Sequence, residues 1–219
     1  MPIALRHRSQ PAIVMAAIAG LAVHRELEPA AMAALQQRPL PDIQARYDAG
    51  HRAYVATMDG VPAAWGWGAT SSATIGELKV AFAVASTERY LWNFVTVPAF
   101  RGRGIYPRLL EAIIAAESVD GERFWIAYAP ENHASGLGIQ KAGFAVVAEL
   151  SFDIHGLAVV KDIQPGGGES VSRLLGLPDT QAVVSQCWKC ARGGILAESA
   201  CAAGICSCDY QRAEVSCAG

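Results

Sequence analysis

The sequence predicts an α/β fold, an α+β mixed sheet flanked by helices, followed by a small cysteine-rich tail. Segments with strand-like and helical patterns alternate over residues 42–163, which is typical of a layered sheet domain. A glycine-rich turn also joins an apolar strand to an amphipathic helix. All six cysteines of the 219-residue chain lie from Cys187 onward, so the tail differs in kind from the domain before it.

Four parts are therefore predicted along the chain. They are an N-terminal helical segment (1–41), the sheet domain (42–163), a linker (164–186) and the cysteine-rich tail (187–219). The linker is inferred from the run Gln164-Pro165-Gly166-Gly167-Gly168, because glycine-rich segments are flexible. A short helix is expected over residues 171–177.

Composition limits the partners. An apolar fraction of 52% is ample for a buried core, and the net charge of −2 argues against a general electrostatic footprint for nucleic acid. No apolar run reaches the roughly 20 residues that a membrane helix needs. We therefore expect neither a nucleic-acid nor a membrane partner, and the oligomeric state is left open.

Residues 11–37 are rich in alanine and predict a helix, which Pro39 and Pro41 end. Arg6, His7 and Arg8 precede the apolar run 11–23, a layout that also occurs in secretory signals. A helix packed against the domain is favoured, because no clear cleavage site with small residues follows the run.

The sheet domain begins with a second helix over residues 42–48, capped by Asp42 and ended by Gly50. Asp59-Gly60 is a strong hairpin signal between two strands. A helix over 131–142 is stopped by Gly143. The predicted strands cover residues 53–58, 62–68, 75–85, 89–97 and 123–129, with one or two more over 144–160.

The turn after the fourth predicted strand is suited to a pyrophosphate. Gly102 and Gly104 carry no Cβ, so the backbone can bend sharply and approach an anion. The helix that follows, in which Pro107 suits a first position, offers unpaired amides with partial positive charge. Arg101 and Arg103 add charge nearby, and Ile105 belongs to the same turn. The alternative is an ordinary strand–turn–helix connection with surface arginines, since glycine-rich turns are common.

This stretch resembles the acetyl-CoA motif of the GNAT superfamily of N-acetyltransferases, Arg/Gln-x-x-Gly-x-Gly/Ala. Arg101, Gly104 and Tyr106 take the three defining positions, and Tyr106 replaces the small residue expected last. The resemblance extends over about residues 42–150. It implies a splayed central sheet, acetyl-CoA as cosubstrate, an amine acceptor and a cytoplasmic location, where acetyl-CoA is found.

A second stretch resembles the family's other CoA motif. Asn132 to Ser135 is followed by Gly143-Phe144, and the resemblance implies that Asn132 binds the pantetheine side of the cofactor. The alternative role of Asn132 is a helix N-cap, which is compatible with the first. The family commonly places a tyrosine seven residues after this asparagine, as the acid that protonates the leaving thiolate. Here that position is Ile139.

Other residues must therefore supply the catalytic groups. Tyr106, Tyr128 and Ser135 are the candidates for the acid. The base that takes the amine proton must be a carboxylate or histidine within reach of the amine. Glu77 is the first candidate, and Glu88, Asn93 and His133 are the others. By resemblance, a backbone amide near Val95 to Val97 forms the oxyanion site.

The cysteine-rich tail predicts a metal site. Cys187 and Cys190 form a C-x₂-C pair, and Cys206 and Cys208 complete a possible four-sulfur set with Cys201 nearby. Zinc is the default ion for such ligands, while iron–sulfur or copper also suits sulfur. Disulfides, redox-active thiols and a tail that is itself modified remain as alternatives.

The function predicted is an acetyl-CoA-dependent N-acetyltransferase acting on a primary amine by direct attack in a ternary complex. Two alternatives stand beside it. One is a non-catalytic acyl-CoA-binding sensor whose cysteine tail responds to metal or redox state. The other is a maturation enzyme that acts on a cysteine-rich peptide like its own tail.

Overall fold

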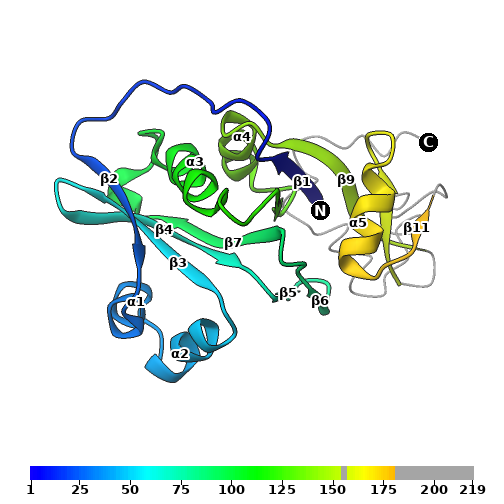
Figure 1. The fold of residues 1–219 in the computed structure, drawn as a ribbon, viewed down its shortest axis with the longest axis horizontal. Coiled ribbons are helices and arrows are strands. Elements are labelled where there is room, and N and C mark those ends of the chain that lie inside the picture. The colour runs from blue at the N-terminus through cyan, green and yellow to red at the C-terminus, as the bar shows by residue number, and fades with distance from the viewer. Residues whose placement is uncertain (154–156, 181–219) are drawn as a thin grey trace, which may run out of the picture.

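The computed structural model describes residues 1–153 and 157–180 and has a nine-stranded sheet with helices on both faces (Figure 1). The strands are β1 (Pro2–His7), β2 (Leu21–Glu26), β3 (Arg52–Met58), β4 (Val61–Ala69), β5 (Ser72–Ile75), β6 (Val80–Ala83), β7 (Glu88–Thr96), β8 (Arg123–Ala127), β9 (Ala145–Phe152), β10 (Ala158–Asp162) and β11 (Asp179–Thr180). The helices are α1 (Pro29–Gln36), α2 (Leu40–Asp48), α3 (Ile105–Glu117), α4 (His133–Lys141) and α5 (Gly167–Leu175), with a 3₁₀ turn at Pro98–Phe100.

The large sheet has the strand order β11-β10-β9-β1-β8-β7-β4-β3-β2, and β5 and β6 form a separate hairpin. The feature of this sheet that matters for the site is the parallel pair β7–β8. Pairing runs from Glu88 opposite Arg123 to Leu91 opposite Ile126, and β7 then continues to Thr96 paired with β4 but no longer with β8. The two strands therefore separate beyond Leu91 and Ile126, as the splayed central sheet implied by the resemblance requires.

Two layers of helix cover the sheet. Helices α3 and α4 lie on one face, where Leu109, Leu110 and Ile113 of α3 pack with Leu91 and Ile126. The opposite face is covered by α1 and α2, by the β5–β6 hairpin and by α5 (Figure 1). Where β7 and β8 separate, the sheet therefore has packed elements on both of its faces.

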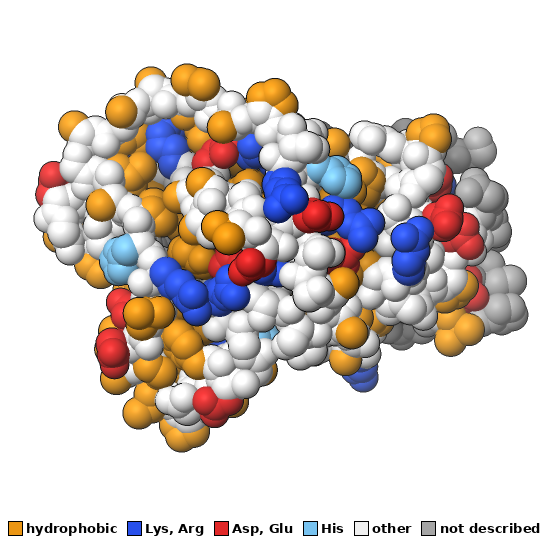
Figure 2. Space-filling model, viewed as in Figure 1, with side chains coloured by type: hydrophobic (Ala, Val, Ile, Leu, Met, Phe, Trp, Pro, Cys, Tyr) orange, Lys and Arg blue, Asp and Glu red, His pale blue; other side chains and the backbone are white. Residues whose placement is uncertain are grey.

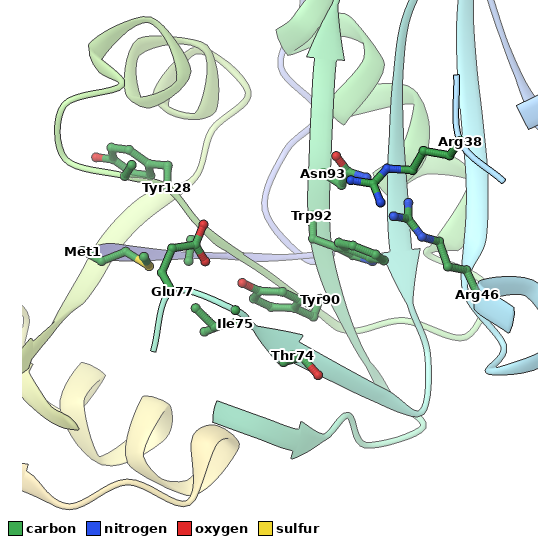
Figure 3. Close-up of a pocket in the computed structure, with 13 residues that line it drawn as sticks. Met1, Arg38, Arg46, Thr74, Ile75, Glu77, Tyr90, Trp92, Asn93 and Tyr128 are labelled. Atoms are coloured by element: carbon green, nitrogen blue, oxygen red, sulfur yellow. The ribbon is translucent and has the colours of Figure 1, made fainter. Parts of the chain in front are cut away.

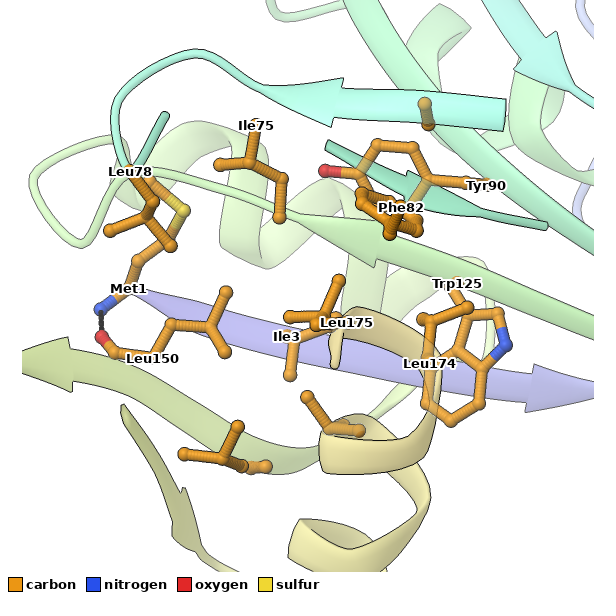
Figure 4. Close-up of a cluster of buried hydrophobic side chains, with 14 of the residues drawn as sticks. Met1, Ile3, Ile75, Leu78, Phe82, Tyr90, Trp125, Leu150, Leu174 and Leu175 are labelled. Carbon is orange, nitrogen blue, oxygen red and sulfur yellow. Dashed lines mark hydrogen bonds between the residues drawn. The ribbon is translucent and has the colours of Figure 1, made fainter. Parts of the chain in front are cut away.

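Helix α5 overlaps the short helix predicted over residues 171–177 and begins earlier, within the glycine run that was interpreted as flexible. Leu174 and Leu175 pack on Ile3 and Trp125 (Figure 4). A Cβ on Gly167 would lie 2.3 Å from the carbonyl oxygen of Val147, so glycine permits the close approach of the helix to β9. The glycine run that suggested flexibility thus allows close packing.

The helix predicted over residues 11–37 is also wrong for most of its length. Only Pro29–Gln36 is helical, whereas Leu21–Glu26 pairs antiparallel with β3. Strand β1 lies in the middle of the sheet between β8 and β9. Alternation explains this strand, since Ile3 belongs to the cluster under α5 and Ala4 to the cluster under α3.

The strand predicted over residues 75–85 is likewise incorrect, because the chain forms the β5–β6 hairpin there instead. The turn between its strands contains Lys79, whose φ of 55° is left-handed. The hairpin packs with Phe82 edge-on to Tyr90, at 5.1 Å between ring centroids. The hairpin thereby covers the sheet beside the point where β7 and β8 separate.

A buried ion network ties the end of α3 to the sheet. The Glu117 carboxylate accepts hydrogen bonds from the Tyr54 hydroxyl at 2.5 Å, from Arg52 at 2.5 Å and from Arg89 Nε at 2.7 Å. Burial by itself would raise the pKa of Glu117, but the hydrogen bonds from Tyr54 and Arg89 and the charges of both arginines leave it below its ordinary value.

Basic and acidic side chains are interspersed over the face shown in Figure 2. Of the helices in the described part of the chain, none has both the length and the apolar character needed to cross a membrane.

Candidate active site

The site is built around a bulge in β7. Trp92 lies opposite Trp67 and Val95 opposite Trp65, so β7 carries one residue more than β4 between these pairs. Asn93 takes up the difference with a left-handed φ of 53°. The bulge falls where β7 has left β8, and Asn93 and its neighbour Phe94 line different cavities.

The first cavity, called here the cofactor cavity, has a volume of about 700 Å³ and opens on the α3–α4 side. The end of β7, the glycine turn, the start of α3 and one side of α4 form its walls. It brings together most of the predicted cofactor and acid residues, namely Val95, Arg101, Gly102, Gly104, Ile105, Tyr106, Asn132 and Ser135.

The glycine turn has the predicted backbone. Gly102 and Gly104 have φ values of 76° and 72°, in the region that glycine tolerates best. Arg108 Nη1 donates to the carbonyl oxygen of Gly104 at 2.8 Å, and a Cβ on Gly104 would lie 2.7 Å from that same nitrogen. The turn is thus held in place by Arg108, and the first residues of α3, Ile105 and Tyr106, line the cavity.

The two arginines of the turn differ in their surroundings. Arg101 lines the cofactor cavity, and its Nε donates to the carbonyl oxygen of Thr96 at 3.1 Å. The Arg103 guanidinium instead lies 5.4 Å from the centroid of the Phe100 ring. Arg103 is not among the described residues that line the cavity.

The hydrogen bonds of β7 reduce the number of backbone amides that could form the predicted oxyanion site. The Val97 amide donates to the carbonyl oxygen of Ala63 at 2.9 Å, and Val97 does not line the cavity in the described structure. The amide of Val97 is therefore already occupied by β4. Because successive amides of a strand point to opposite sides, Thr96 and Phe94 direct theirs to the open edge.

Tyr106 and Ser135 meet at the cavity wall. Their hydroxyl oxygens lie 3.4 Å apart. Burial raises the pKa of Tyr106 to about 12, although the hydrogen bond with Ser135 acts in the opposite direction. A Cβ on Gly138 would lie 2.4 Å from the Tyr106 ring, so glycine in α4 makes room for the bulky residue of the motif. The phenol is protonated at neutral pH.

Asn132 serves as the N-cap of α4. Its side-chain oxygen accepts a hydrogen bond from the Ser135 amide at 3.0 Å, which is the structural role considered for it. It also lines the cofactor cavity. Ile139, at the position of the family's tyrosine, is fully buried in the α3-side core and cannot reach a ligand.

The second cavity, called here the acceptor cavity, has a volume of about 650 Å³ and lies on the opposite face of β7. Figure 3 shows Glu77 across this cavity from Arg38 and Arg46. Trp92 lines the cavity, whereas Trp67 and Trp125 belong to the core. Its remaining walls come from Met1, Thr74, Ile75, Gly76, Tyr90, Asn93, Ala127, Tyr128 and Ala129.

The other predicted bases are placed elsewhere. Glu88 is buried at the start of β7 and forms an ion pair with Arg123 at 2.6 Å. His133 is exposed at the start of α4. Neither lines a cavity of the described site, whereas Glu77 and Asn93 both line the acceptor cavity.

Sequence reasoning missed Arg38 and Arg46. The Arg46 guanidinium lies 4.8 Å from the Trp92 ring centroid and 5.2 Å from that of Trp67. Both arginines belong to the segment that covers the sheet from α1 to α2. Their position at the cavity depends on a contact between the α1–α2 segment and the sheet, and no local sequence pattern predicts such a contact.

The metal prediction falls outside the described residues, because Cys187, Cys190, Cys206 and Cys208 all lie beyond Thr180. Within residues 1–153 and 157–180, no three His, Cys, Asp or Glu side chains gather closely enough to hold a metal ion. Zinc binding by the tail stays a prediction.

Similar folds occur among solved structures. A GCN5-related N-acetyltransferase from Kribbella flavida has 15% identity and a TM-score of 0.43, with 66% of this chain and 53% of that chain covered. A GNAT-family acetyltransferase from Novosphingobium aromaticivorans has 22% identity and a TM-score of 0.44, with 66% and 59% covered. The chain thus spans little more than half the length of these two proteins.

A third similar structure is aminoglycoside N-acetyltransferase AAC(6′)-Iy in complex with CoA. It has 19% identity and a TM-score of 0.49, with 64% of this chain and 97% of that chain covered. A search of curated proteins found no significant match.

The sequence itself matches a family model. The model of the acetyltransferase (GNAT) family aligns with residues 16–144, which include both cavities' β7 walls, the glycine turn and α4. The match covers more than half of the chain and confirms the predicted family. The chain belongs to the acetyltransferase (GNAT) family.

Proposed function

We propose that the protein transfers an acetyl group from acetyl-CoA to a primary amine by direct attack in a ternary complex. One observation carries this proposal. Two cavities on opposite faces of the sheet reach the same bulge, where Asn93 lines the acceptor cavity and Phe94 the cofactor cavity. A donor and an acceptor could meet there without either one leaving its cavity.

On the cofactor side, the turn from Arg101 to Tyr106 would hold the pyrophosphate through its backbone amides and the Arg101 charge. The pantetheine arm would follow the open edge of β7 toward the bulge. The amides of Thr96 and Phe94 offer donors along this edge, and one of them would stabilise the oxyanion of the tetrahedral intermediate.

The chemical step needs two proton transfers. The neutral amine nitrogen forms a bond to the acetyl carbon, and its proton passes to the Glu77 carboxylate directly or through water. Collapse of the intermediate breaks the carbon–sulfur bond. The thiolate leaves as CoA and takes a proton from Tyr106, whose hydroxyl contacts that of Ser135.

The proposal is tested by incubating the full chain with acetyl-CoA and a panel of primary amines. Release of CoA thiol, together with an amine product that is heavier by one acetyl group, is the expected result. Tight acetyl-CoA binding without any acetylated product would overturn it.

That second outcome would favour the alternative of a CoA-binding sensor, which has one observation behind it. The position where the family commonly has its acid tyrosine is the buried core residue Ile139. Attack on a thioester requires only modest acid assistance, because a thiolate is a good leaving group. The absence of that tyrosine is therefore compatible with catalysis.

A further inference from the structure

We propose that the acceptor is a small amine that also carries a carboxylate, and that Arg38 and Arg46 bind this carboxylate. The inference rests on the proposed function and names the class of its acceptor. It starts from the two guanidinium groups at one end of the acceptor cavity (Figure 3).

Neither arginine forms an ion pair in the described part of the chain, and Asp42 is the acidic side chain whose charge acts on Arg46. The ion pairs found within the described residues include neither Arg38 nor Arg46. Arg46 Nη1 donates to the side-chain oxygen of Gln36 at 3.2 Å, which is a neutral acceptor. Arg46 is half-buried and Arg38 is exposed. Two guanidinium groups at one end of a cavity, neither of them in an ion pair within the described residues, indicate a place for an anion.

Packing fixes the position of Arg46. Its guanidinium lies over the Trp92 ring at 4.8 Å and over the Trp67 ring at 5.2 Å, and Trp92 Nε1 donates to His51 Nδ1 at 3.1 Å. A guanidinium held by aromatic faces has lost much of its freedom before a ligand arrives. It can therefore offer its N–H groups to a carboxylate at a reduced entropic cost.

The two positive charges also destabilise one another. Burial lowers the pKa of Arg46, the charge of Arg38 lowers it further, and Asp42 only partly opposes these effects. A bound carboxylate would offset the repulsion between the guanidinium groups.

The other end of the cavity has the opposite charge. Glu77 is the one acidic side chain among the described residues that line it, and Figure 3 places it beside Met1 and Tyr90, away from the arginines. Asn93 lies toward the arginine end in the same view. A molecule with an amine and a carboxylate matches this separation of charges, whereas a polycation would meet two arginines.

The experiment compares pairs of amines that differ only in the carboxylate, such as lysine with cadaverine and phenylalanine with phenethylamine. An aminoglycoside serves as the polycationic comparison. Two readouts are taken for each amine, the kcat/KM of acetylation and the Kd measured by calorimetry in the presence of CoA. The second readout does not require turnover.

The variants are Arg38→Gln, Arg46→Gln and Arg46→Lys, with Arg173→Gln as the matched control. Arg173 is exposed on α5 and pairs with Glu169 at 3.4 Å, away from the acceptor cavity. Arg46→Lys keeps the positive charge but loses the planar guanidinium. If this variant retains part of the preference for the carboxylate that Arg46→Gln loses, the charge contributes separately from the packing. Thermal melting of each variant reports whether it folds.

We expect the amine with a carboxylate to be preferred by about ten- to a hundredfold, and Arg38→Gln to remove most of that preference. Equal binding and turnover of the paired amines, or a preference that survives Arg38→Gln, would overturn the inference and leave the proposed function intact. Selective binding of the carboxylates without acetylation would support the inference while the proposed function failed. Absence of both binding and turnover would overturn the inference too.

Discussion

The hydroxyl of Tyr106 lies 3.4 Å from the hydroxyl of Ser135, so the first turn of α3 contacts α4 beside the cofactor cavity. Tyr106 takes the place of a small residue in the motif that the turn resembles. The contact brings an ionisable hydroxyl to the cavity although Ile139 occupies the position of the usual tyrosine.

Tyr106→Phe tests this hydroxyl with little change of shape. We expect kcat for acetyl transfer to fall by about a hundredfold, because the leaving thiolate would lose its proton donor. The Kd for acetyl-CoA should stay nearly the same. Steady-state kinetics and calorimetry measure the two quantities, and an unaltered kcat would remove Tyr106 from the mechanism.

Gly104→Asp tests the pyrophosphate turn. The new carboxylate would repel the phosphates, and its Cβ would approach Arg108 Nη1 at a position whose φ is 72°. We expect acetyl-CoA binding to be lost while the protein stays folded. Gly60→Asp is the matched control, since Gly60 has φ of 82° in the hairpin between β3 and β4 and does not line either cavity described here. Binding by the Gly104 variant at the wild-type Kd would contradict the assignment.

Glu117→Gln tests the ion network at the end of α3. Neutralising the carboxylate leaves Arg89 buried without its counterion, and we expect the free energy of unfolding to fall by about 3–5 kcal/mol. Urea denaturation measures the change. Glu169→Gln, which breaks the exposed pair with Arg173, should cost less than about 0.5 kcal/mol. Similar losses in both variants would refute a special role for the buried network.

The same carboxylate predicts how stability depends on pH. The pKa of Glu117 is lower in the folded protein than its ordinary value, so its stabilising contribution is complete above that ordinary value. The contribution is lost as the pH falls through the folded pKa. Between neutral pH and strong acid, the Glu117→Gln variant should lose less stability than the wild type. Parallel stability curves for the two proteins would rule this out.

Gly167→Ala tests the docking of α5. The added methyl would lie 2.3 Å from the Val147 carbonyl oxygen, and overpacking of this kind costs about 1–3 kcal/mol. Gly76→Ala is the control, because a Cβ there meets nothing within 4 Å. Chemical denaturation compares the two variants. A Gly167 variant as stable as the control would show that the helix can shift without loss.

Local features of the fold were predictable from the sequence. The hairpin signal at Asp59-Gly60 and the helix predicted after the glycine turn are confirmed, since each depends on neighbouring residues alone. Strand β1 was not predicted, because its pairing partners lie far along the chain. The glycines before α5 were misread for a related reason, since the surface that they approach is supplied by β9.

The candidate site divides in the same way. The glycine turn, Tyr106, Ser135 and Asn132 could be grouped in advance because they belong to motifs and fall around one cavity. The Val97 amide could not be excluded from sequence, since its bond to Ala63 depends on the register of two strands. Arg38 and Arg46 gain their significance only from the sheet beneath α2.

The central position of β1 has a consequence for biosynthesis. Ile3 pairs with Ala127 on one side and with Ala148 on the other, so a nascent chain that has exposed β1 must still await both neighbours. Until they emerge from the ribosome, the apolar strand has no permanent partner. The hairpin of β3 and β4 can form early, but closure of the sheet is postponed until β9 is synthesised, and chaperones would have most to protect during that interval.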